Sequence, residues 1–459
     1  MQRYALWICP ALSGLVLFLS EHPARLSLIG TMALYPMFAV LAARPELSAR
    51  RVANAAALFG AVYAVPLALM LGFPFTLALA QVLLVIAGWV IVWLGVARAL
   101  RLGPFAGPIV AVAWMALFEW AEMTFVPIWG TAQSFVRSCS SMPWTIQVVT
   151  LGGMSALVFV AVLPQALLAA SLRKLSRPAV FVAFVVLLGN YGVGWWCCHR
   201  DESGQREKLA AIGWLSTPER SNQQVLDELI EPNVHSAAHQ GATLAVTPEM
   251  GLVLGGADRT EILERLSNLA RTDHIRLAIG WFDLDENRNH VTLFDADGHA
   301  SEPYTKTHLV PFLERYPAGN GTLVTSGDVG TMICQDDNFT DLARGYGRRA
   351  TPIVAVPTND WREVAPYHLE NSIFRAVENR YVLVRATKDG TSAIVSSTGM
   401  VLEMDHFQEG AGMIVAPVPR APADAWRLYA HVDLAPVVWA AILAYGVWMA
   451  RRQGKVSTA

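Results

Sequence analysis

Long apolar runs alternate with short polar connections over much of the chain. Each run is near the ~20 residues that a helix needs to cross about 30 Å of hydrocarbon. The runs are Tyr4–Ser20, Leu26–Ala43, Val52–Gly72, Phe75–Val96, Phe105–Ala121, Gly153–Leu172, Val180–Trp196 and Pro436–Ala450. They predict about seven transmembrane helices on the N-terminal side and one near the C-terminus. The first run follows Arg3 and lacks a small-x-small cleavage site, so we expect an uncleaved helix and not a signal peptide.

Residues 198–432 have a different, soluble pattern. Short β-type runs alternate with amphipathic stretches and are followed by consecutive strands, which is typical of a layered α/β domain. The expected strands are Leu209–Leu215, Thr243–Thr247, Arg276–Phe282, Val291–Phe294, Gly330–Cys334, Pro352–Pro357, Tyr381–Arg385 and Ser392–Ser396. The expected helices are Gln223–His239, Arg259–Thr272 and Tyr367–Asn379. We therefore predict a membrane domain (1–197), a soluble α/β domain (198–432), and a C-terminal transmembrane helix with a short basic tail (433–459).

The composition supports a large lipid-facing surface. Hydrophobic residues make up 54% of the 459 residues, charged residues only 16%, and the mean hydropathy is +0.37, whereas ordinary soluble chains carry about 25% charged residues. The net charge of −2 gives no reason to expect nucleic acid as a partner. No CxxC pair accompanies a His cluster, so no zinc site is expected, and the cysteine count neither requires nor excludes a disulfide. The five cysteines are Cys9, Cys139, Cys197, Cys198 and Cys334.

The charges of the short connections predict the orientation in the membrane. Lys and Arg gather in alternate connections and in the C-terminal tail, at Arg44, Arg50, Arg51, Arg98, Arg101, Arg173, Lys174, Arg177, Arg451, Arg452 and Lys455. The other set of connections holds only Arg25 and Arg137. Because positive charge stays on the cytoplasmic side, we expect a multi-pass inner-membrane protein with both termini in the cytoplasm. The 198–432 domain would then be periplasmic or otherwise extracytoplasmic.

The predicted outer connection Met123–Gly152 is long and aromatic, with Pro127, Trp129 and Trp144. Two interpretations stand side by side. It is either an interfacial loop or a lid that contacts substrate, since long loops are often functional.

Three points in the soluble domain suggest chemistry. Glu249 follows an apolar strand, Lys306 lies in a stiff aromatic loop, and Cys334 ends a strand. Functional groups of α/β sheets gather beyond the carboxyl ends of strands. A thiol nucleophile, a carboxylate that moves its proton and an ammonium that stabilises an oxyanion form a coherent set for acyl transfer. Taken singly, each residue would more often be structural or solvated, so the interpretation depends on the combination.

In this order the three residues resemble the Glu–Lys–Cys triad of the nitrilase superfamily. The segment KTHLVPFLERYP, residues 306–317, is similar to the lysine motif K-x-x-L-V-P-F-G-E-x-x-P of a membrane-bound branch, apolipoprotein N-acyltransferase. RAVENR (375–380), TKDGTSA (387–393), Glu119-Trp120 and the order of the helices are similar to that branch as well. The resemblance covers essentially the whole chain and implies an αββα sandwich for residues 198–432.

The resemblance also implies roles and substrates. Cys334 would be the nucleophile that carries a thioester, Glu249 the general base and acid, Lys306 the cation at the oxyanion, and Glu314 a supporting carboxylate. The acyl donor would be a phospholipid and the acceptor the N-terminal amine of a diacylglyceryl-cysteine apolipoprotein, in a ping-pong reaction. No metal or organic cofactor is implied.

Several positions depart from the family pattern. Thr247 stands for Trp, Gln335 for Tyr, Leu313 for Gly, and Ile212–Thr217 for a strand ending in Gln-Gly-Asn. Gln335, Asp336 and Trp129 are the residues expected to line the substrate pocket. The departures keep two alternatives open: a membrane-tethered amidase or esterase, or an N-acyltransferase with another amine as acceptor. A non-catalytic membrane binding protein is the third interpretation.

Overall fold

The structure is a computed structural model, and it describes residues 4–21, 30, 32–126, 128–172, 175–201, 205–216, 220–406, 411–422 and 424–456. The chain divides into two compact units. Unit 1 comprises residues 1–126, 133–195 and 433–459, and unit 2 comprises residues 127–132 and 196–432. Residues 127–132, which the sequence analysis assigned to the membrane domain, therefore cluster with unit 2. The exact boundaries 197/198 and 432/433 stay predictions.

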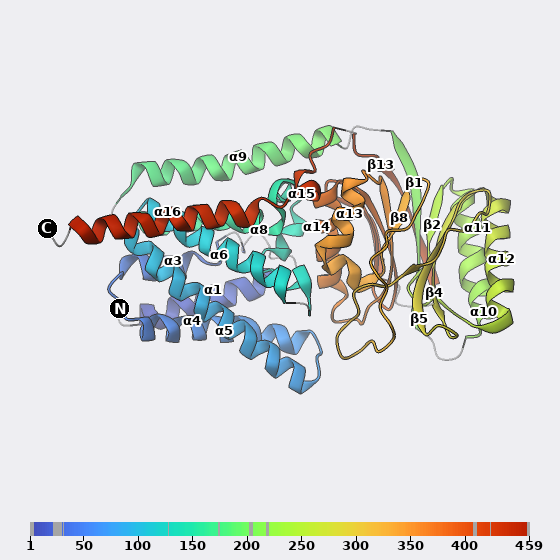
Figure 1. The fold of residues 1–459 in the computed structure, drawn as a ribbon, viewed down its shortest axis with the longest axis horizontal. Helices are drawn as coiled ribbons and strands as arrows, with labels where there is room; N and C mark the ends of the chain where they lie inside the picture. Colours follow the sequence, from blue (N-terminus) through green and yellow to red (C-terminus); the bar gives the residue numbers. More distant parts are fainter. Residues whose placement is uncertain are drawn as a thin grey trace. The chain divides into compact units, whose positions relative to one another are not determined.

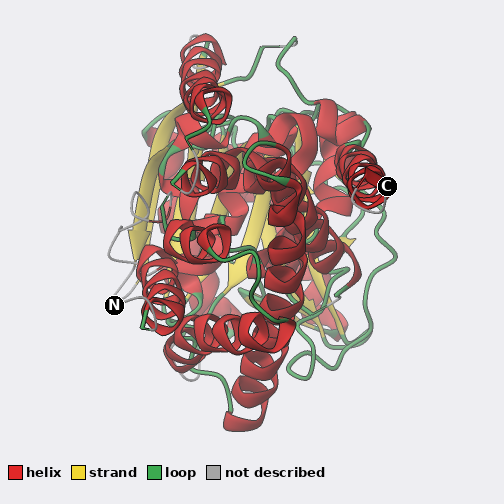
Figure 2. Ribbon diagram, turned by 90° about the vertical axis from the view of Figure 1, so that its left-hand side faces the viewer, coloured by secondary structure: helices red, strands yellow, loops and turns green. Residues whose placement is uncertain are grey.

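Unit 1 is built from long apolar helices that run alongside one another (Figures 1 and 2). The helices are α1 Ala5–Glu21, α3 Tyr35–Ala43, α4 Ala49–Met70, α5 Phe75–Ala99, α6 Ala106–Phe125, α8 Val149–Ser171, α9 Arg177–Asp201 and α16 Ala435–Val456. Within the described residues, five helices are long and apolar enough to cross a membrane: α4, α5 with its continuation η1 (Leu100–Leu102), α6, α8 and α9. The predicted multi-pass helical part is confirmed.

The remaining predicted spans are partly matched. The apolar helix α1 is shorter, at 17 residues, and the predicted C-terminal run lies within α16. Of the predicted run Leu26–Ala43, the nine residues of α3 are helical, while residues 22–29 and 31 lie outside the described residues. The connection after α6 is not a plain loop, because it contains η2 (Gly130–Gln133), η3 (Arg137–Ser141) and α7 (Pro143–Ile146).

The helices of unit 1 differ in how much of their apolar surface is buried within the unit. The apolar window of α8 is 72% buried, whereas those of α5 and α9 are 17% buried. Apolar side chains on the outside of a bundle are stable when they face hydrocarbon. The polar groups lie inside: Arg137 NH2 is 3.1 Å from Glu21 Oε2, and the Tyr63 hydroxyl is 2.9 Å from both oxygens of Glu21. Arg137 is therefore a buried ion-pair partner and not a solvated loop charge.

Unit 2 has one hydrogen-bonded network of strands between two groups of helices (Figure 1). The strands are β1 Arg206–Trp214, β2 Leu244–Val246, β3 Leu252–Leu254, β4 Arg276–Asp283, β5 Arg288–Phe294, β6 Tyr304–Thr305, β7 Thr325–Ser326, β8 Val329–Thr331, β9 Ile353–Asn359, β10 Val382–Lys388, β11 Thr391–Val395, β12 Val401–His406 and β13 Ala411–Pro419. The helical segments are α10 Asn222–Val225, η4 Leu226–Ile230, α11 Glu231–His239, α12 Gly256–Asp273, η5 Cys334–Asn338, α13 Thr340–Arg348, α14 Ala365–Asn379 and α15 Leu428–His431.

The strand order is β6-β5-β4-β2-β1-β10-β9-β8-β7, with β11 on β10, β12 on β11, β13 on β1 and β3 on β4. Helices α10 to α12 cover one side and α13 and α14 the other (Figure 1). Apolar side chains of β1, β2 and β4 pack against those of α11 and α12, and the cluster includes Ile212 of β1, Val234 of α11 and Leu266 of α12, all fully buried. The predicted helical membrane part plus an α/β domain is thus confirmed.

The sheet topology brings several strand ends to one edge. Strands β4, β2, β1, β10, β9 and β8 run parallel to one another. Trp214, Lys388 and Asn359, the last residues of β1, β10 and β9, are direct register partners. The segments that follow β2 and β8 leave at the same edge, and they carry Glu249 and Cys334. The edge beyond the carboxyl ends of parallel strands is where ligands bind in open α/β sheets.

Some predicted elements differ from the observed ones. The expected strand Gly330–Cys334 ends at Thr331, because Cys334 starts the tight helical turn η5. The expected helix Gln223–His239 is interrupted by the π-helical turn η4. Strands β3, β6, β7, β12 and β13 and helix α13 were not predicted; β3, β6 and β7 have only two or three residues each, too few for a hydrophobic period to show.

Candidate active site

Glu249 occupies a tight turn beyond β2. Its carboxyl group is buried, and Oε1 accepts hydrogen bonds from Asn289 Nδ2 at 2.6 Å and Lys306 Nζ at 2.8 Å. The turn presses on the neighbouring strand: a Cβ at Gly280 in β4 would lie 2.3 Å from the carbonyl oxygen of Pro248. Glycine at this position lets the turn approach β4, and that approach sets the direction of the Glu249 side chain.

Lys306 follows the short strand β6 and is completely buried. Besides Glu249 it contacts Glu314, with Nζ 2.6 Å from Oε1. Glu314 Oε2 accepts the backbone N–H of Val310 at 2.7 Å, so the loop that carries Glu314 folds back on itself. Burial disfavours the ammonium, but the carboxylates of Glu249 and Glu314, and the Cys334 sulfur when it is ionised, outweigh burial and hold the pKa of Lys306 well above its usual value.

The lysine loop accommodates Leu313 at the position where the family pattern has glycine. The residue with positive φ is Phe312, at 69°, and not Leu313, which takes the place of the family glycine. Leu313 and Phe312 are both exposed, so the leucine side chain has room.

Cys334 begins the turn η5 and lies in a strained backbone conformation, with φ of 46°. A non-glycine residue in the left-handed region costs free energy and persists where the surroundings impose it, often at functional sites. Its Sγ lies 3.8 Å from the carbonyl oxygen of Asn359. Burial and the nearby charge of Glu249 raise the pKa of the Cys334 thiol well above its usual value, while Lys306 opposes the rise. The resting group at neutral pH is therefore the thiol.

Asp336 ties the cysteine turn to the lysine loop. Its carboxylate accepts the Tyr304 hydroxyl at 2.7 Å and the backbone N–H groups of Thr307 at 3.1 Å and His308 at 2.6 Å. It also accepts the backbone N–H of Ile333 at 3.0 Å. With no exposed surface, this carboxylate holds the cysteine turn and the lysine loop together, and its role at a substrate pocket stays a prediction.

A buried charged cluster lies beside the thiol. His368 Nε2 is 2.8 Å from Asp337 Oδ1, and His368 Nδ1 is 2.7 Å from Asp360 Oδ1. Arg385 NH1 is 3.1 Å from Asp337 Oδ2, and Arg385 NH2 is 2.7 Å from Asp360 Oδ2. Burial and Arg385 disfavour a charged imidazole, but Asp360 and Asp337 outweigh them and raise the pKa of His368 to about 9. The cluster thus joins the cysteine turn to the turn after β9.

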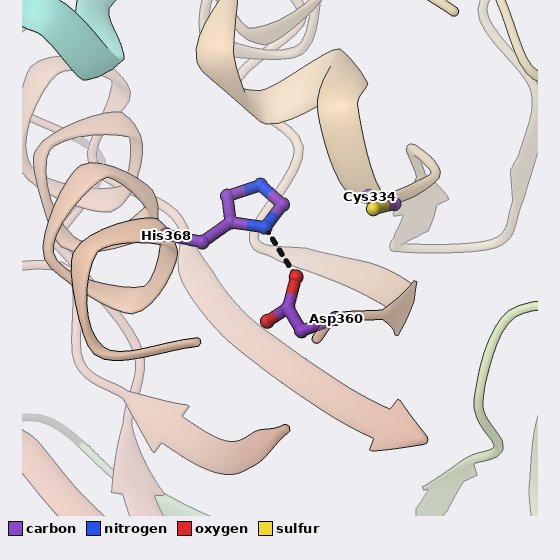
Figure 3. Close-up of side chains that lie close together, drawn as sticks. All are labelled: Cys334, Asp360 and His368. Carbon is purple, nitrogen blue, oxygen red and sulfur yellow. Dashed lines mark hydrogen bonds and ion pairs between the residues drawn. The ribbon is translucent and has the colours of Figure 1, made fainter. Parts of the chain in front are cut away.

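Cys334, Asp360 and His368 are close enough together to be compared with a metal site. Cys334 Sγ, an oxygen of Asp360 and a nitrogen of His368 lie within 4.8 Å of one another (Figure 3). Thiolate, carboxylate and imidazole are all zinc ligands, but a ligating imidazole must be neutral and offer a free nitrogen. Both nitrogens of His368 face carboxylates, so the trio fits a hydrogen-bonded network better than a metal centre.

The other residues expected at a substrate pocket have defined positions. Gln335 is buried, with Nε2 3.0 Å from the carbonyl oxygen of Ile128 and Oε1 2.7 Å from Asn338 Nδ2. Its amide is thus occupied by the protein itself. Trp129 is half-buried and belongs to the short segment of unit 2 that contains Ile128. Its role as a pocket residue stays a prediction.

Five residues of the site were missed from the sequence: Asn289, Asp337, Asp360, His368 and Arg385. Two features of the sequence could have identified part of this set. Asn359-Asp360 comes shortly after an expected strand, as Glu249 does. Arg385 stands within an apolar strand, and a buried arginine needs charged partners. Nothing local marks Asn289 or His368.

Comparisons with known proteins agree with this geometry. The profile of the carbon-nitrogen hydrolase family matches residues 209–428. The apolipoprotein N-acyltransferase of Gloeobacter violaceus is 28% identical over 363 residues, which cover 71% of this chain and 69% of that protein. The apolipoprotein N-acyltransferase of Geobacter metallireducens is 28% identical over 313 residues, covering 58% and 60% respectively.

The solved structures that resemble this chain include amidases. An amidase from Nesterenkonia sp. aligns with 48% of this chain and 92% of that chain, at 23% identity and a TM-score of 0.40. A cysteine-to-alanine variant of the enzyme in complex with butyramide aligns with 52% and 99%, at 22% identity and a TM-score of 0.43. Residues 209–428 therefore match a carbon-nitrogen hydrolase domain, and the chain is similar to apolipoprotein N-acyltransferases over up to 71% of its length.

Proposed function

We propose that this chain is a membrane acyltransferase that moves a fatty acyl chain to the N-terminal amine of a lipid-modified apolipoprotein. One observation carries the proposal: Lys306, fully buried, contacts Glu249 at 2.8 Å and Glu314 at 2.6 Å, and its ammonium favours the thiolate form of Cys334. A carboxylate, an ammonium and a thiol in one enclosed site suit acyl transfer. The relatives carry the name of this activity.

In the first step the Cys334 sulfur attacks the ester carbonyl carbon of the donor while Glu249 takes the thiol proton. Lys306 stays charged and stabilises the negative oxygen of the tetrahedral intermediate. The carbon–oxygen bond then breaks, Glu249 returns the proton to the departing alcohol oxygen, and a thioester remains on Cys334. Because the resting cysteine is a thiol, proton transfer to Glu249 accompanies the attack.

In the second step the acceptor amine attacks the thioester carbon. Glu249 takes a proton from the amine, the carbon–sulfur bond breaks, and the sulfur recovers a proton from Glu249. The products are an amide and the free thiol, so the enzyme returns to its starting state. Glu314 has a different role, because its two oxygens hold Lys306 and the backbone of its own loop.

A membrane phospholipid is the donor that fits the chain best. Unit 2 continues at one end into α9 and at the other into α16, so the thiol cannot diffuse away from a membrane. Lipid esters are concentrated there, whereas soluble amides are not. We further infer that both termini are cytoplasmic and unit 2 is periplasmic, since the described connections and tail with excess Arg, such as Arg44 and Arg98, alternate with the others.

The test is complementation. Cells depleted of their own lipoprotein N-acyltransferase would express this chain, and lipoprotein N-termini would be analysed by mass spectrometry. An amide-linked third acyl chain is expected with the wild type and not with Cys334→Ser. If the N-termini stay free while Cys334 carries an acyl thioester, the chemistry holds and the acceptor assignment is refuted.

Glu249→Gln separates the role of Glu249 from its position. The amide has nearly the same shape, but it cannot accept the thiol proton, so we expect no thioester. Asn289→Ala serves as a matched comparison, because it removes a donor to the same carboxylate without removing the base or adding a charge beside it. Thioester formation by Glu249→Gln at the wild-type rate would contradict the assignment of the base.

A further inference from the structure

A short piece of the connection between membrane helices α6 and α8 belongs to the catalytic unit. Residues 127–132 cluster with unit 2, while the chain on either side, from α6 and from residue 133 onward, clusters with unit 1. We refer to its described part, Ile128–Ala132, as the connecting segment. Its contacts show what it touches within unit 2.

The connecting segment is bonded to the turn that carries the cysteine. The Ile128 carbonyl oxygen accepts Gln335 Nε2 at 3.0 Å. Thr131 Oγ1 lies 2.9 Å from the carbonyl oxygen of Asn338 and 2.6 Å from Asn371 Oδ1, and its single proton serves either. Gln335 and Asn338 are also bonded to each other, at 2.7 Å. The contacts therefore span the turn from its second to its last residue.

Gly130 makes the approach possible. Its φ is 54°, and a Cβ there would lie 2.2 Å from the carbonyl oxygen of Asn338 and 3.0 Å from its carbonyl carbon. The obstacle is backbone, which cannot rotate away as a flexible side chain can. The two backbones are in direct contact, so the connecting segment and the cysteine turn have to move together.

The turn itself needs such support. Cys334 has the strained φ of 46°, and the residues after it are each held from outside the turn. Asp336 bonds to the lysine loop, Asp337 to His368, and Asn371 Nδ2 donates to the carbonyl oxygen of Asp337 at 3.0 Å. The connecting segment supplies the support for Gln335 and Asn338.

We propose that Ile128–Ala132 is a positioning element of the active site, which fixes the Cys334 turn for attack. The catalytic centre is then incomplete without the chain between two membrane helices. The segment acts as a fixed support and not as a lid, because moving it breaks the bonds to Gln335 and Asn338. The inference rests on the proposed function in that it takes Cys334 as the nucleophile.

The test uses full-length protein in detergent micelles mixed with phosphatidylethanolamine and phosphatidylglycerol. The single-turnover rate of thioester formation on Cys334 is measured by mass spectrometry at several lipid concentrations. In Gly130→Ala the limiting rate should fall on the order of 10- to 100-fold, since small misplacements of reacting groups cost about that much. The lipid concentration at half-maximal rate should stay unchanged.

Gly256→Ala is the matched control. Gly256 has nearly the same φ, 55°, with nothing within 4 Å of a Cβ, so it reports backbone strain alone and should react like wild type. Thr131→Val, which keeps the shape of Thr131 and loses its hydroxyl, should slow the reaction, and Thr131→Ser should restore it. If Gly130→Ala does not fold, Thr131→Val decides. A folded Thr131→Val or Gly130→Ala with the wild-type rate overturns the proposal.

Iodoacetamide distinguishes this proposal from the proposed function. It alkylates a thiol without any lipid substrate. The rate of Cys334 alkylation and its dependence on pH therefore report the conformation of the turn and not lipid binding. If wild type forms no thioester, the acyl-transfer proposal fails. An alkylation profile that is the same in wild type, Gly130→Ala and Thr131→Val would then still refute the positioning role, and a changed profile would support it.

Discussion

His368→Gln should remove a specific part of the pH dependence of stability. The imidazole is buried between Asp337 and Asp360, and its pKa is raised from 6.5 to about 9. A rise of that size corresponds to about 3 kcal/mol. Because the folded value exceeds the unfolded one, this stabilisation is complete below the unfolded pKa and is lost as the pH rises through about 9. Glutamine carries no proton to lose and has no such term.

The assay is thermal unfolding of unit 2 within the full-length protein in detergent, followed from pH 6 to pH 10. For a domain of this size, 1 kcal/mol shifts Tm by about 2–4 °C, so wild type should lose roughly 6–12 °C more than His368→Gln over that range. His299→Gln is the control, since His299 is exposed and lies 3.0 Å from Asp295. If the Tm of wild type and that of His368→Gln fell equally with rising pH, the idea of a charged imidazole held by two carboxylates would be refuted.

Three further predictions concern other parts of the chain. Lys306→Ala should leave a folded protein whose thioester forms on the order of 10²–10³ times more slowly, the usual loss for one oxyanion donor, and a rate within twofold of wild type would contradict the role. Gly280→Ala should lower the Tm of unit 2 and the acylation rate together, because the added Cβ meets the Pro248 carbonyl at 2.3 Å; retention of both would show that the turn can shift freely. A reporter active only outside the cytoplasm should be silent when fused after Ala459 and active when inserted within unit 2. The reverse result would refute the predicted topology.

Local pattern was enough for a large part of this protein. Unbroken apolar runs identified the helices of unit 1, because lipid demands them over the full length of a span. The period-two and strand-end patterns located β1, β4, β9 and β10 and the positions of Glu249 and Cys334. The lysine motif identified Lys306 and Glu314, because its residues are adjacent in sequence and their spacing is readable.

Other features exist only after folding. Asp337 and His368 are 31 residues apart, and Arg385 lies 48 residues from Asp337. Gln335 and Ile128 are separated by 207 residues. No period or motif links such positions to one another, because they lie far apart in the sequence. The parallel order of the strands, which brings distant strand ends to one edge, is what joins them.

The same reason explains why the contacts of Gln335 and Asp336 could not be predicted from the sequence. Spacing put Gln335 and Asp336 next to the cysteine, but spacing does not say which way a side chain points. The tight turn that starts at Cys334 directs both side chains into the protein, where Asn338 and the lysine loop occupy their polar atoms. Chain-local pattern therefore marked the candidate catalytic groups, and tertiary packing decided which neighbours hold them in place, because most buried polar groups are paired with whatever partner the fold supplies.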